Sequence, residues 1–404
     1  MEASKKPLKI FCNIYDVLQP LYSVIRVFGS IVFTVNSAEE DEFEIRPANW
    51  IHVAISFSIL LAFLILNIQM DMHTLESLTD IVGTMTRFIV VIGILVVIET
   101  TLTNRFLQKY LWKLLRCLNS FDKKMATLNA PVNHTLHRKW MVRLMMSLGA
   151  LCFVLGAFNV GTITMISPKK LLGFFSSLTY TVISYAFLFY VSHFIVILVN
   201  IKERFRLLNQ CFRNHFATND YYTIVKTSSD ESCSFITTLS KLHDSLNDSV
   251  SLANGYFALP MLIALTCVFA DIVVTIFTIY CVFTRSHAVE DFWTSMIYGF
   301  DCLFYSFFVL IVITIASDLT FQGKFTATLI HKAINRTEDA KVAEKLKEWS
   351  LQMVHRQPIV TCGLFPYDWT LFYSIIAAIC AYVTILIQFD TTKFYSQAAF
   401  NGTK

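Results

Sequence analysis

Turn-forming residues and charges are scarce in this chain. Only 12 Gly and 8 Pro occur among 404 residues, and charged residues make up 15%, against about 25% in ordinary soluble domains. The shortage of Gly and Pro argues against turn-rich β structure, and the shortage of charge argues against a soluble domain. Hydrophobic residues make up 55%. The composition therefore predicts an all-α membrane protein built from long helices.

Motifs for catalysis and metal binding are also missing. The ten cysteines follow no disulfide or metal-ligand pattern, and neither H-E-x-x-H nor G-x-S-x-G occurs. The common metalloprotease and hydrolase signatures are thus excluded. The net charge of +4 is the sum of loop charges and does not indicate nucleic-acid binding. We expect no enzymatic activity, no cofactor, no metal and no nucleic-acid partner.

Seven stretches are long and apolar enough to span a membrane. A helix needs about 20 apolar residues to cross ~30 Å of hydrocarbon, and stretches such as Trp50–Met70 and Leu171–Ile201 reach this length without one charge. The expected spans are residues 50–70, 79–101, 141–166, 171–201, 257–283, 292–317 and 368–389.

Basic residues are rare in every second gap between these spans. Residues 1–49, 102–140, 202–256 and 318–367 together hold 26 of the 33 Lys and Arg. Because basic residues stay on the cytosolic side, the N-terminus is expected in the cytosol and the C-terminus outside. A G-protein-coupled receptor, whose seven helices begin outside, would have to export those 26 residues, so that class is rejected.

One further apolar stretch is ambiguous. Pro20–Val35 is short, contains Arg26 and is followed by an acidic run at residues 39–44. It is either a helix at the inner interface or against the bundle, or an eighth span that leaves only the first 19 residues outside.

Apolar stripes continue beyond the spans. Positions that recur at helical spacing predict that the fourth, fifth and sixth helices extend into the cytosol and that an amphipathic helix precedes the last span. Their apolar faces pack either within one subunit or against another subunit. The stripes are Ile201, Phe205, Leu208 and Phe212; Leu239, Leu242, Leu246 and Val250; and Val342, Leu346, Trp349 and Met353.

The end of the chain carries a family resemblance. The run Tyr382–Phe389 matches the closing Thr-Tyr-(five apolar)-Gln-Phe motif of insect gustatory receptors, with Ala381 where that family usually has Thr. The run Cys362–Phe365 with Asp368 and Leu371-Phe372, and the run Asn254–Phe257 with Leu242-His243 and Leu246, are similar to that family's approaches to its last and fifth spans. Seven spans with an inward N-terminus cover the whole chain.

The resemblance implies a tastant-gated, non-selective cation channel in the plasma membrane of a sensory neuron. Such receptors resemble homo- or heterotetramers with other gustatory receptors, in which the last helix of each subunit lines a central pore. Monovalent and divalent cations and the lipid bilayer are the other expected partners.

The pattern of the last helix agrees with a pore. Tyr382, Ile385, Gln388 and Phe389 fall at i, i+3, i+6 and i+7 on one helix face. Ile385 and Phe389 would form an apolar constriction, and Gln388 would replace it with uncharged oxygens on opening. In a tetramer Asp390 would add a ring of carboxylates at the outer mouth, which attracts cations.

Ionisable residues within spans indicate a ligand site, because each costs about 2.5–3.5 kcal/mol to insert. Arg87, Asp271 and Asp301 stand out, and hydroxyl and aromatic residues lie at a similar depth. An aromatic, hydroxyl-rich cleft suits a small polar organic ligand. The remaining candidates are Asn159, Thr162, Tyr180, Ser184, Tyr185, Thr275, Trp293, Tyr298 and Tyr305.

These expectations divide the chain into seven parts. They are a cytosolic segment with an interfacial helix (1–49), spans one to four as the ligand-binding bundle (50–201), cytosolic extensions of helices four and five (202–256), spans five and six (257–317), a cytosolic anchor with an amphipathic helix (318–367), the pore-lining helix (368–390) and an extracellular tail (391–404).

Two other functions stay open beside the gustatory channel. An odorant-type receptor shares the inverted topology, and a secondary transporter would need paired repeats and broken helices that the sequence lacks. The ligand is either a sugar or a bitter or other plant compound. Of four glycosylation sequons, only Asn401 falls outside; Asn133, Asn247 and Asn335 fall in the cytosol.

The orientation predicts the accessibility of the two chain ends. An epitope tag at Met1 should bind antibody only after cells are permeabilised, whereas a tag at Lys404 should bind in intact cells. Surface staining of intact cells compares the two. Staining of the Met1 tag without permeabilisation would contradict the predicted topology.

Overall fold

The computed structural model describes residues 13–27, 91–96, 98–99, 102–103, 106–166, 170–216, 228–285 and 289–401, with single positions at 58, 62 and 84. The first predicted span and most of the second lie outside the described residues. The described helices are α1 (Ile14–Val27), α5 (Gln108–Thr127), α6 (His134–Ile166), α7 (Lys170–Phe216), α8 (Ser229–Arg285), α9 (Val289–Arg336), α10 (Ala340–His355) and α11 (Trp369–Asn401).

The described part is helical throughout, with one isolated bridge between Thr361 and Pro366. Within it, four helical segments are long and apolar enough to cross a membrane: His134–Gly161, Ser229–Thr284, Cys302–Arg336 and Trp369–Thr392. The predicted all-α membrane fold is confirmed. The third to seventh predicted spans correspond to α6, α7, α8, α9 and α11.

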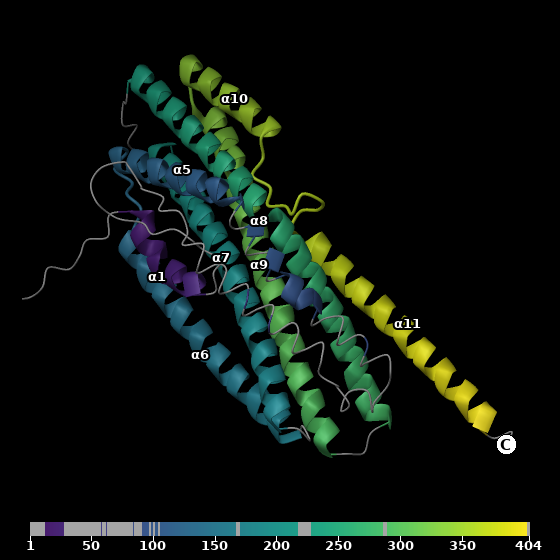
Figure 1. Ribbon diagram of the computed structural model, residues 1–404. Coiled ribbons are helices and arrows are strands. Elements are labelled where there is room, and N and C mark those ends of the chain that lie inside the picture. Colours follow the sequence, from purple (N-terminus) through teal and green to yellow (C-terminus); the bar gives the residue numbers. More distant parts are fainter. Residues whose placement is uncertain are drawn as a thin grey trace, which may run out of the picture.

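Three of the helices are much longer than a membrane is thick. α7, α8 and α9 contain 47, 57 and 48 residues, or about 70–85 Å at 1.5 Å per residue, against ~30 Å of hydrocarbon. They run side by side, and α10 packs on the far ends of α8 and α9 (Figure 1). The stripes at Phe205 and Phe212 of α7 and at Leu346 and Trp349 of α10 are buried inside this single chain.

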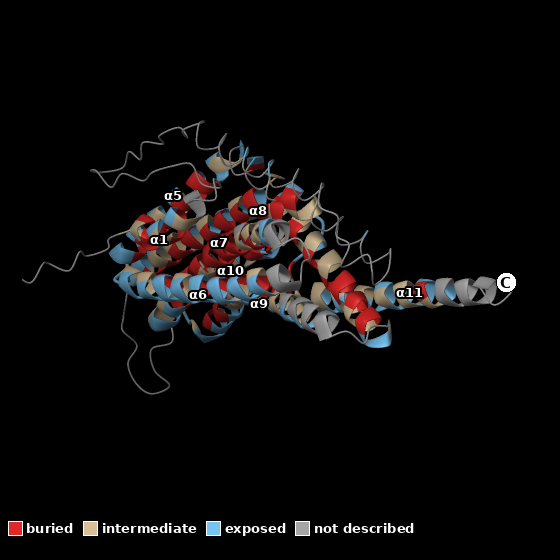
Figure 2. Cartoon of the chain, turned by 60° about the horizontal axis from the view of Figure 1, so that its bottom comes forward, coloured by how far each residue is buried: buried red, intermediate tan, exposed pale blue. Residues whose placement is uncertain are grey.

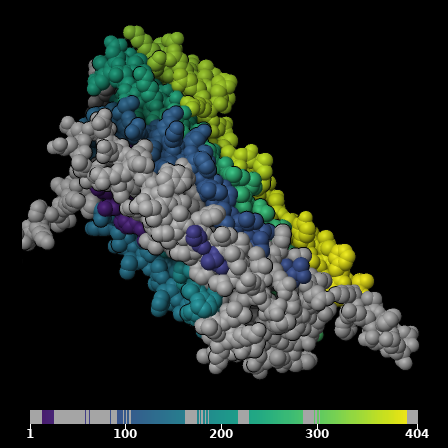
Figure 3. Space-filling model, in the orientation of Figure 1, coloured from purple at the N-terminus to yellow at the C-terminus, as the bar shows by residue number. Residues whose placement is uncertain are grey.

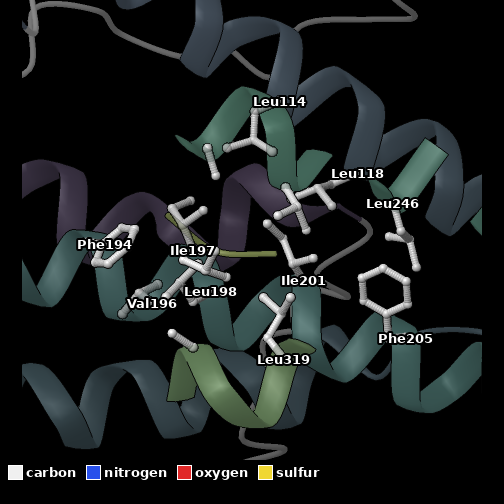
Figure 4. Close-up of a cluster of buried hydrophobic side chains, with 14 of the residues drawn as sticks. Leu114, Leu118, Phe194, Val196, Ile197, Leu198, Ile201, Phe205, Leu246 and Leu319 are labelled. Carbon is white, nitrogen blue, oxygen red and sulfur yellow. The ribbon is translucent and has the colours of Figure 1, made fainter. Parts of the chain in front are cut away.

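The core is centred on α7. Its residues from Leu188 to Ile201 are almost all buried, and Figure 2 shows the buried positions concentrated on α7 and its neighbours. In Figure 4, Ile197 and Ile201 of α7 lie among Leu114 and Leu118 of α5 and Leu319 of α9. A helix that is buried on every side reads as apolar all round, which explains the uncharged run in the sequence.

The N-terminal helix α1 packs against the bundle. Leu18 and Leu21 are fully buried, and α1 contacts α5, α6 and α7. The Asn13 side chain accepts the backbone N–H of Asp16 at 3.1 Å, which satisfies one of the free amides at the helix start. Residues 14–27 thus lie on the bundle, and residues 28–35 of the ambiguous stretch lie outside the described residues.

The last helix continues past its predicted end at residue 389 and reaches Asn401. No Pro or Gly interrupts residues 369–401, and Gly402 follows directly. The hydroxyl groups of Thr391 and Thr392 bond to carbonyl groups one turn back, at 2.9 and 2.8 Å. These hydroxyl groups find their hydrogen-bond acceptors on the helix itself. The helix therefore continues through the more polar sequence that begins at Asp390.

A connecting segment, residues 356–368, joins α10 to α11 and is fastened along α8. Asn254 bonds to it twice, donating to the Ile359 carbonyl at 2.8 Å and accepting from the Thr361 amide at 3.2 Å. Arg356 pairs with Asp244 and Asp248 of α8. Asn247, one of the sequons, donates to the Arg356 carbonyl at 3.1 Å and is buried, so a glycan has no room there. At the end of the segment, Asp368 caps α11 by accepting from the Leu371 amide at 3.0 Å.

A buried ion pair joins α5 to α7. The guanidinium of Arg204 donates two hydrogen bonds to the Asp122 carboxylate, at 2.8 and 2.6 Å, and one to the Asn200 carbonyl at 2.8 Å. Arg204 is 1% exposed and Asp122 is 7% exposed. His134 at the start of α6 lies 3.5 Å from the same carboxylate. One charge cluster therefore fixes three helices.

Breaking this pair should destabilise the protein strongly. Arg204→Met leaves the Asp122 carboxylate buried without its cation, which costs about 3–5 kcal/mol. Arg206→Met is the matched control, because Arg206 is 69% exposed and lies 3.7 Å from Glu203, where a surface pair contributes at most about 1 kcal/mol. Thermal unfolding of the purified chain in detergent measures both. Equal midpoints for the two variants would contradict the assigned role of the pair.

Candidate functional site

A polar cavity, here called the outer cavity, lies between α6, α7 and α9. Its volume is about 30 Å³, well below the range of about 300–1,000 Å³ for sites that hold a small molecule, so a ligand would have to push its walls apart. Four of the predicted ligand residues line it together: Asn159, Ser184, Tyr185 and Tyr305. The rest of the lining consists of Cys152, Leu155, Gly156, Thr181, Leu188 and Phe304.

Two tyrosines form the walls of the outer cavity and are held by hydrogen bonds. The Tyr305 hydroxyl of α9 donates to the Ser184 hydroxyl of α7 at 3.1 Å. The Tyr185 hydroxyl donates to the backbone carbonyl of Cys152 on α6. Gly156 is required for this approach, because a Cβ at that position would clash with the Tyr185 hydroxyl. The two bonds tie α6 to α7 and α7 to α9 at the cavity.

Two polar atoms of the lining have no hydrogen-bond partner in the described part of the chain. They are the side-chain oxygens of Asn159 and Thr181, both buried. An unsatisfied buried polar group costs about 1–3 kcal/mol, so a ligand group that bonds to either atom recovers this cost. The outer cavity therefore combines aromatic walls with two oriented polar groups and carries no charged residue in its described lining.

Two other predicted ligand residues, Asp271 and Thr275, do not line the outer cavity. Asp271 and Thr275 lie on α8, which contributes nothing to the lining of the outer cavity. The side chains of Arg87, Thr162, Tyr180, Trp293, Tyr298 and Asp301 lie outside the described residues.

Several residues that shape the cavity carry no functional signal in the sequence. Gly156, Leu155, Leu188 and Phe304 read as ordinary apolar helix positions. A Gly within an otherwise continuous helical pattern is the one available signal, because it often marks a close approach of another group.

Four of the five predicted pore residues are exposed on α11. Among the described helices, α11 contacts α8 and α9, and Figure 3 shows it as a yellow band along one edge of the molecule. Tyr382, Ile385, Gln388 and Phe389 are all exposed. Asp390 differs, because it is only 2% exposed within the single chain. A carboxylate ring at the pore mouth stays a prediction.

A hydrophobic contact links the outer cavity to α11. Tyr305 packs with Val268 and Ile272 of α8, and Ile379 of α11 packs against this same cluster. One turn further along, Phe269 of α8 makes an edge-to-face ring contact with Tyr382 of α11, with the centroids 5.8 Å apart. One layer of side chains, Val268 and Ile272, therefore separates Tyr305 from α11.

Comparison with known proteins identifies the family. A family model described as "7tm Chemosensory receptor" matches residues 18–393. Two similar curated proteins come from Drosophila melanogaster. "Putative gustatory receptor 28a" is 28% identical over 169 residues, covering 41% of this chain and 38% of the relative. "Putative gustatory receptor 28b" is 25% identical over 308 residues, covering 70% and 65%. The chain thus spans less than two thirds of either relative's length.

Solved structures show the same fold. The insect olfactory receptor OR5 from Machilis hrabei is 10% identical, with a TM-score of 0.61 and coverage of 93% of this chain and 98% of that chain. Its complex with eugenol gives a TM-score of 0.62 at the same identity and coverage. At this identity the likeness concerns the fold alone. The match over nearly the whole sequence and the gustatory relatives confirm the resemblance seen at the end of the chain: the protein belongs to the 7tm chemosensory receptor family, a family of receptors rather than enzymes.

Proposed function

We propose that the protein is a gustatory receptor, a tastant-gated non-selective cation channel of the sensory-neuron plasma membrane whose pore is formed by α11 of four subunits. The observation that carries this proposal is the exposure of α11. In the most apolar stretch of α11 only 6% of the residues are buried, against 44% in the most apolar stretch of α8. Lipid can cover an apolar face, but the exposed Gln388 beside Phe389 favours a surface that meets water or other subunits.

Binding in the outer cavity supplies the gating step. A tastant that bonds to Asn159 or displaces the Ser184–Tyr305 hydrogen bond changes the position of the Tyr305 ring. The cluster of Val268, Ile272 and Ile379 carries that change to α11. Rotation of four α11 helices would move Phe389 away from the axis and bring Gln388 toward it.

The lining of the outer cavity favours a neutral ligand. A cationic alkaloid requires a carboxylate or several open aromatic faces, and the described lining contains no acidic residue. A neutral plant compound with one ring and one or two polar groups fits the two walls of Tyr185 and Tyr305. A sugar, which has many hydroxyls, would leave most of them unpaired here.

The odorant-type receptor is the second candidate. The fold is shared with the olfactory receptor OR5, the structure of which includes a complex with eugenol. The gustatory assignment is favoured because both curated relatives carry that name and because the Gln-Phe ending is present.

The role of Asn159 in binding can be separated from a structural role. Asn159→Leu removes a buried amide oxygen that has no partner among the described residues, so the protein should unfold at an equal or higher temperature. If the amide binds the ligand, the tastant concentration for half-maximal current should rise about 2–10-fold, the equivalent of one hydrogen bond.

The matched control is Ser177→Ala. The Ser177 hydroxyl is also buried without a partner among the described residues but does not line the outer cavity. Tastants are screened by current recordings on cells that express the chain with G-protein signalling blocked. An unchanged half-maximal concentration in Asn159→Leu would remove this residue from the binding site.

Two substitutions on opposite sides of α11 test whether Phe389 forms a constriction. Phe389→Ala shortens an apolar side chain in every subunit, so current in the absence of tastant should increase. Tyr373→Ala is the control, because Tyr373 is 66% exposed, close to the 67% of Phe389, and lies about 160° away around the helix at 100° per residue. Basal current that is the same in both variants would exclude a gate at Phe389.

A further inference from the structure

The outer cavity has the size of a water molecule rather than that of a tastant. Its volume is about 30 Å³, and the share of one molecule in liquid water is also about 30 Å³. Oxygen atoms form part of its surface. The cavity is partly open, so a water molecule can enter it without separating the helices.

Two helices present unsatisfied polar groups to this space. Asn159 of α6 and Thr181 of α7 line it, and their side-chain oxygens are buried without a hydrogen-bond partner in the described part of the chain. The amide oxygen of Asn159 can only accept a hydrogen bond, whereas the hydroxyl of Thr181 can donate or accept one. A molecule between them that both donates and accepts would satisfy the two groups at once, and water is the smallest molecule that does so.

A third polar group completes the surroundings of such a molecule. The Ser184 hydroxyl lines the same cavity and accepts the hydrogen bond from Tyr305, so its own proton can be donated to another acceptor. Buried water molecules typically make about three hydrogen bonds, whereas an apolar space of the same size stays dry. The outer cavity offers the polar groups that a bound water requires.

We propose that, without a bound tastant, the outer cavity holds one ordered water molecule that bridges Asn159 of α6 to Thr181 of α7. The water donates one proton to the Asn159 amide oxygen and makes its second bond with the Thr181 hydroxyl. This bridge ties α6 to α7 close to the bond between Tyr185 and Cys152. Water binding of this kind depends on packing and not on channel activity, so a dry cavity would leave the proposed function to its own tests.

The test is X-ray radiolysis of the purified full chain in lipid nanodiscs, with the oxidised residues mapped by mass spectrometry. A short pulse splits a bound water in place, and the hydroxyl radical oxidises a reactive side chain beside it. The reporter is Cys152, which lines the outer cavity and is 4% exposed. The reference is Cys362 of the connecting segment, a free thiol that is also 4% exposed. Because both thiols are equally shielded from radicals in bulk water, a bound water should make the oxidation of Cys152 several-fold faster.

Variants test the place of the water. Asn159→Leu combined with Thr181→Val removes both polar groups and keeps a branched side chain at each position, so Cys152 should be oxidised no faster than Cys362. Thr181→Val alone is a smaller change that should slow the oxidation in part, and it serves if the double variant does not fold. Ser177→Ala is the matched control, because it removes a buried hydroxyl that does not line the cavity, and it should leave the oxidation of Cys152 unchanged.

Two results would overturn the proposal. The first is oxidation of Cys152 in the unaltered chain that is no faster than that of Cys362. The second is fast oxidation of Cys152 that persists when the polar groups of Asn159 and Thr181 are removed, or that Ser177→Ala abolishes to the same extent. If none of the variants folds, the comparison of the two thiols in the unaltered chain decides.

Discussion

The burial of α7 on all sides between Leu188 and Ile201 is the constraint on which the other helices depend. In this stretch its side chains belong to one buried cluster with residues of α1, α5, α6, α8 and α9, so each neighbour has to present an apolar face at the right height. This burial stabilises the fold by about 25 cal/mol for each Å² of apolar surface removed from water. The Arg204–Asp122 ion pair also fixes the position of α7 along α5. An ion pair with two parallel hydrogen bonds tolerates one register only, whereas apolar side chains tolerate several.

The packing around α7 is looser at the outer cavity, where the proposed binding site lies. The outer cavity lies toward one end of α7, beyond the fully buried run, and its lining includes two buried polar groups without a hydrogen-bond partner among the described residues. Tyr305 joins this cavity to the core, because its hydroxyl bonds to Ser184 at the cavity while its ring packs with Val268 and Ile272.

Much of this arrangement was predictable from the sequence. The uncharged run 171–201 and the stripe that ends at Phe212 gave the long helix α7, because helical periodicity is a local property. Ser184, Tyr185 and Tyr305 were placed in one cleft because they share a depth. The Arg204–Asp122 pair was not predicted, since the two residues are 82 positions apart and meet only through tertiary packing. Asp390 was placed in the pore from its neighbours, but its exposure depends on how α11 is rotated against α8. The continuation of α11 beyond residue 389 was likewise not predicted. The apolar run ends at that point, and neither Pro nor Gly marks the end of the helix there.

The connecting segment also decides how α11 can move. Asn254 and Arg356 hold the connecting segment to α8, directly before the Asp368 cap at the start of α11. In the proposed gating movement, α11 would tilt as a lever with its pivot at Asp368. Phe389 lies 21 residues from that pivot, or about 30 Å at 1.5 Å per residue, so a swing of about 5° displaces it by about 3 Å. In the proposed channel, a small displacement near the base of α11 would thus be enlarged at the constriction that Phe389 is expected to form.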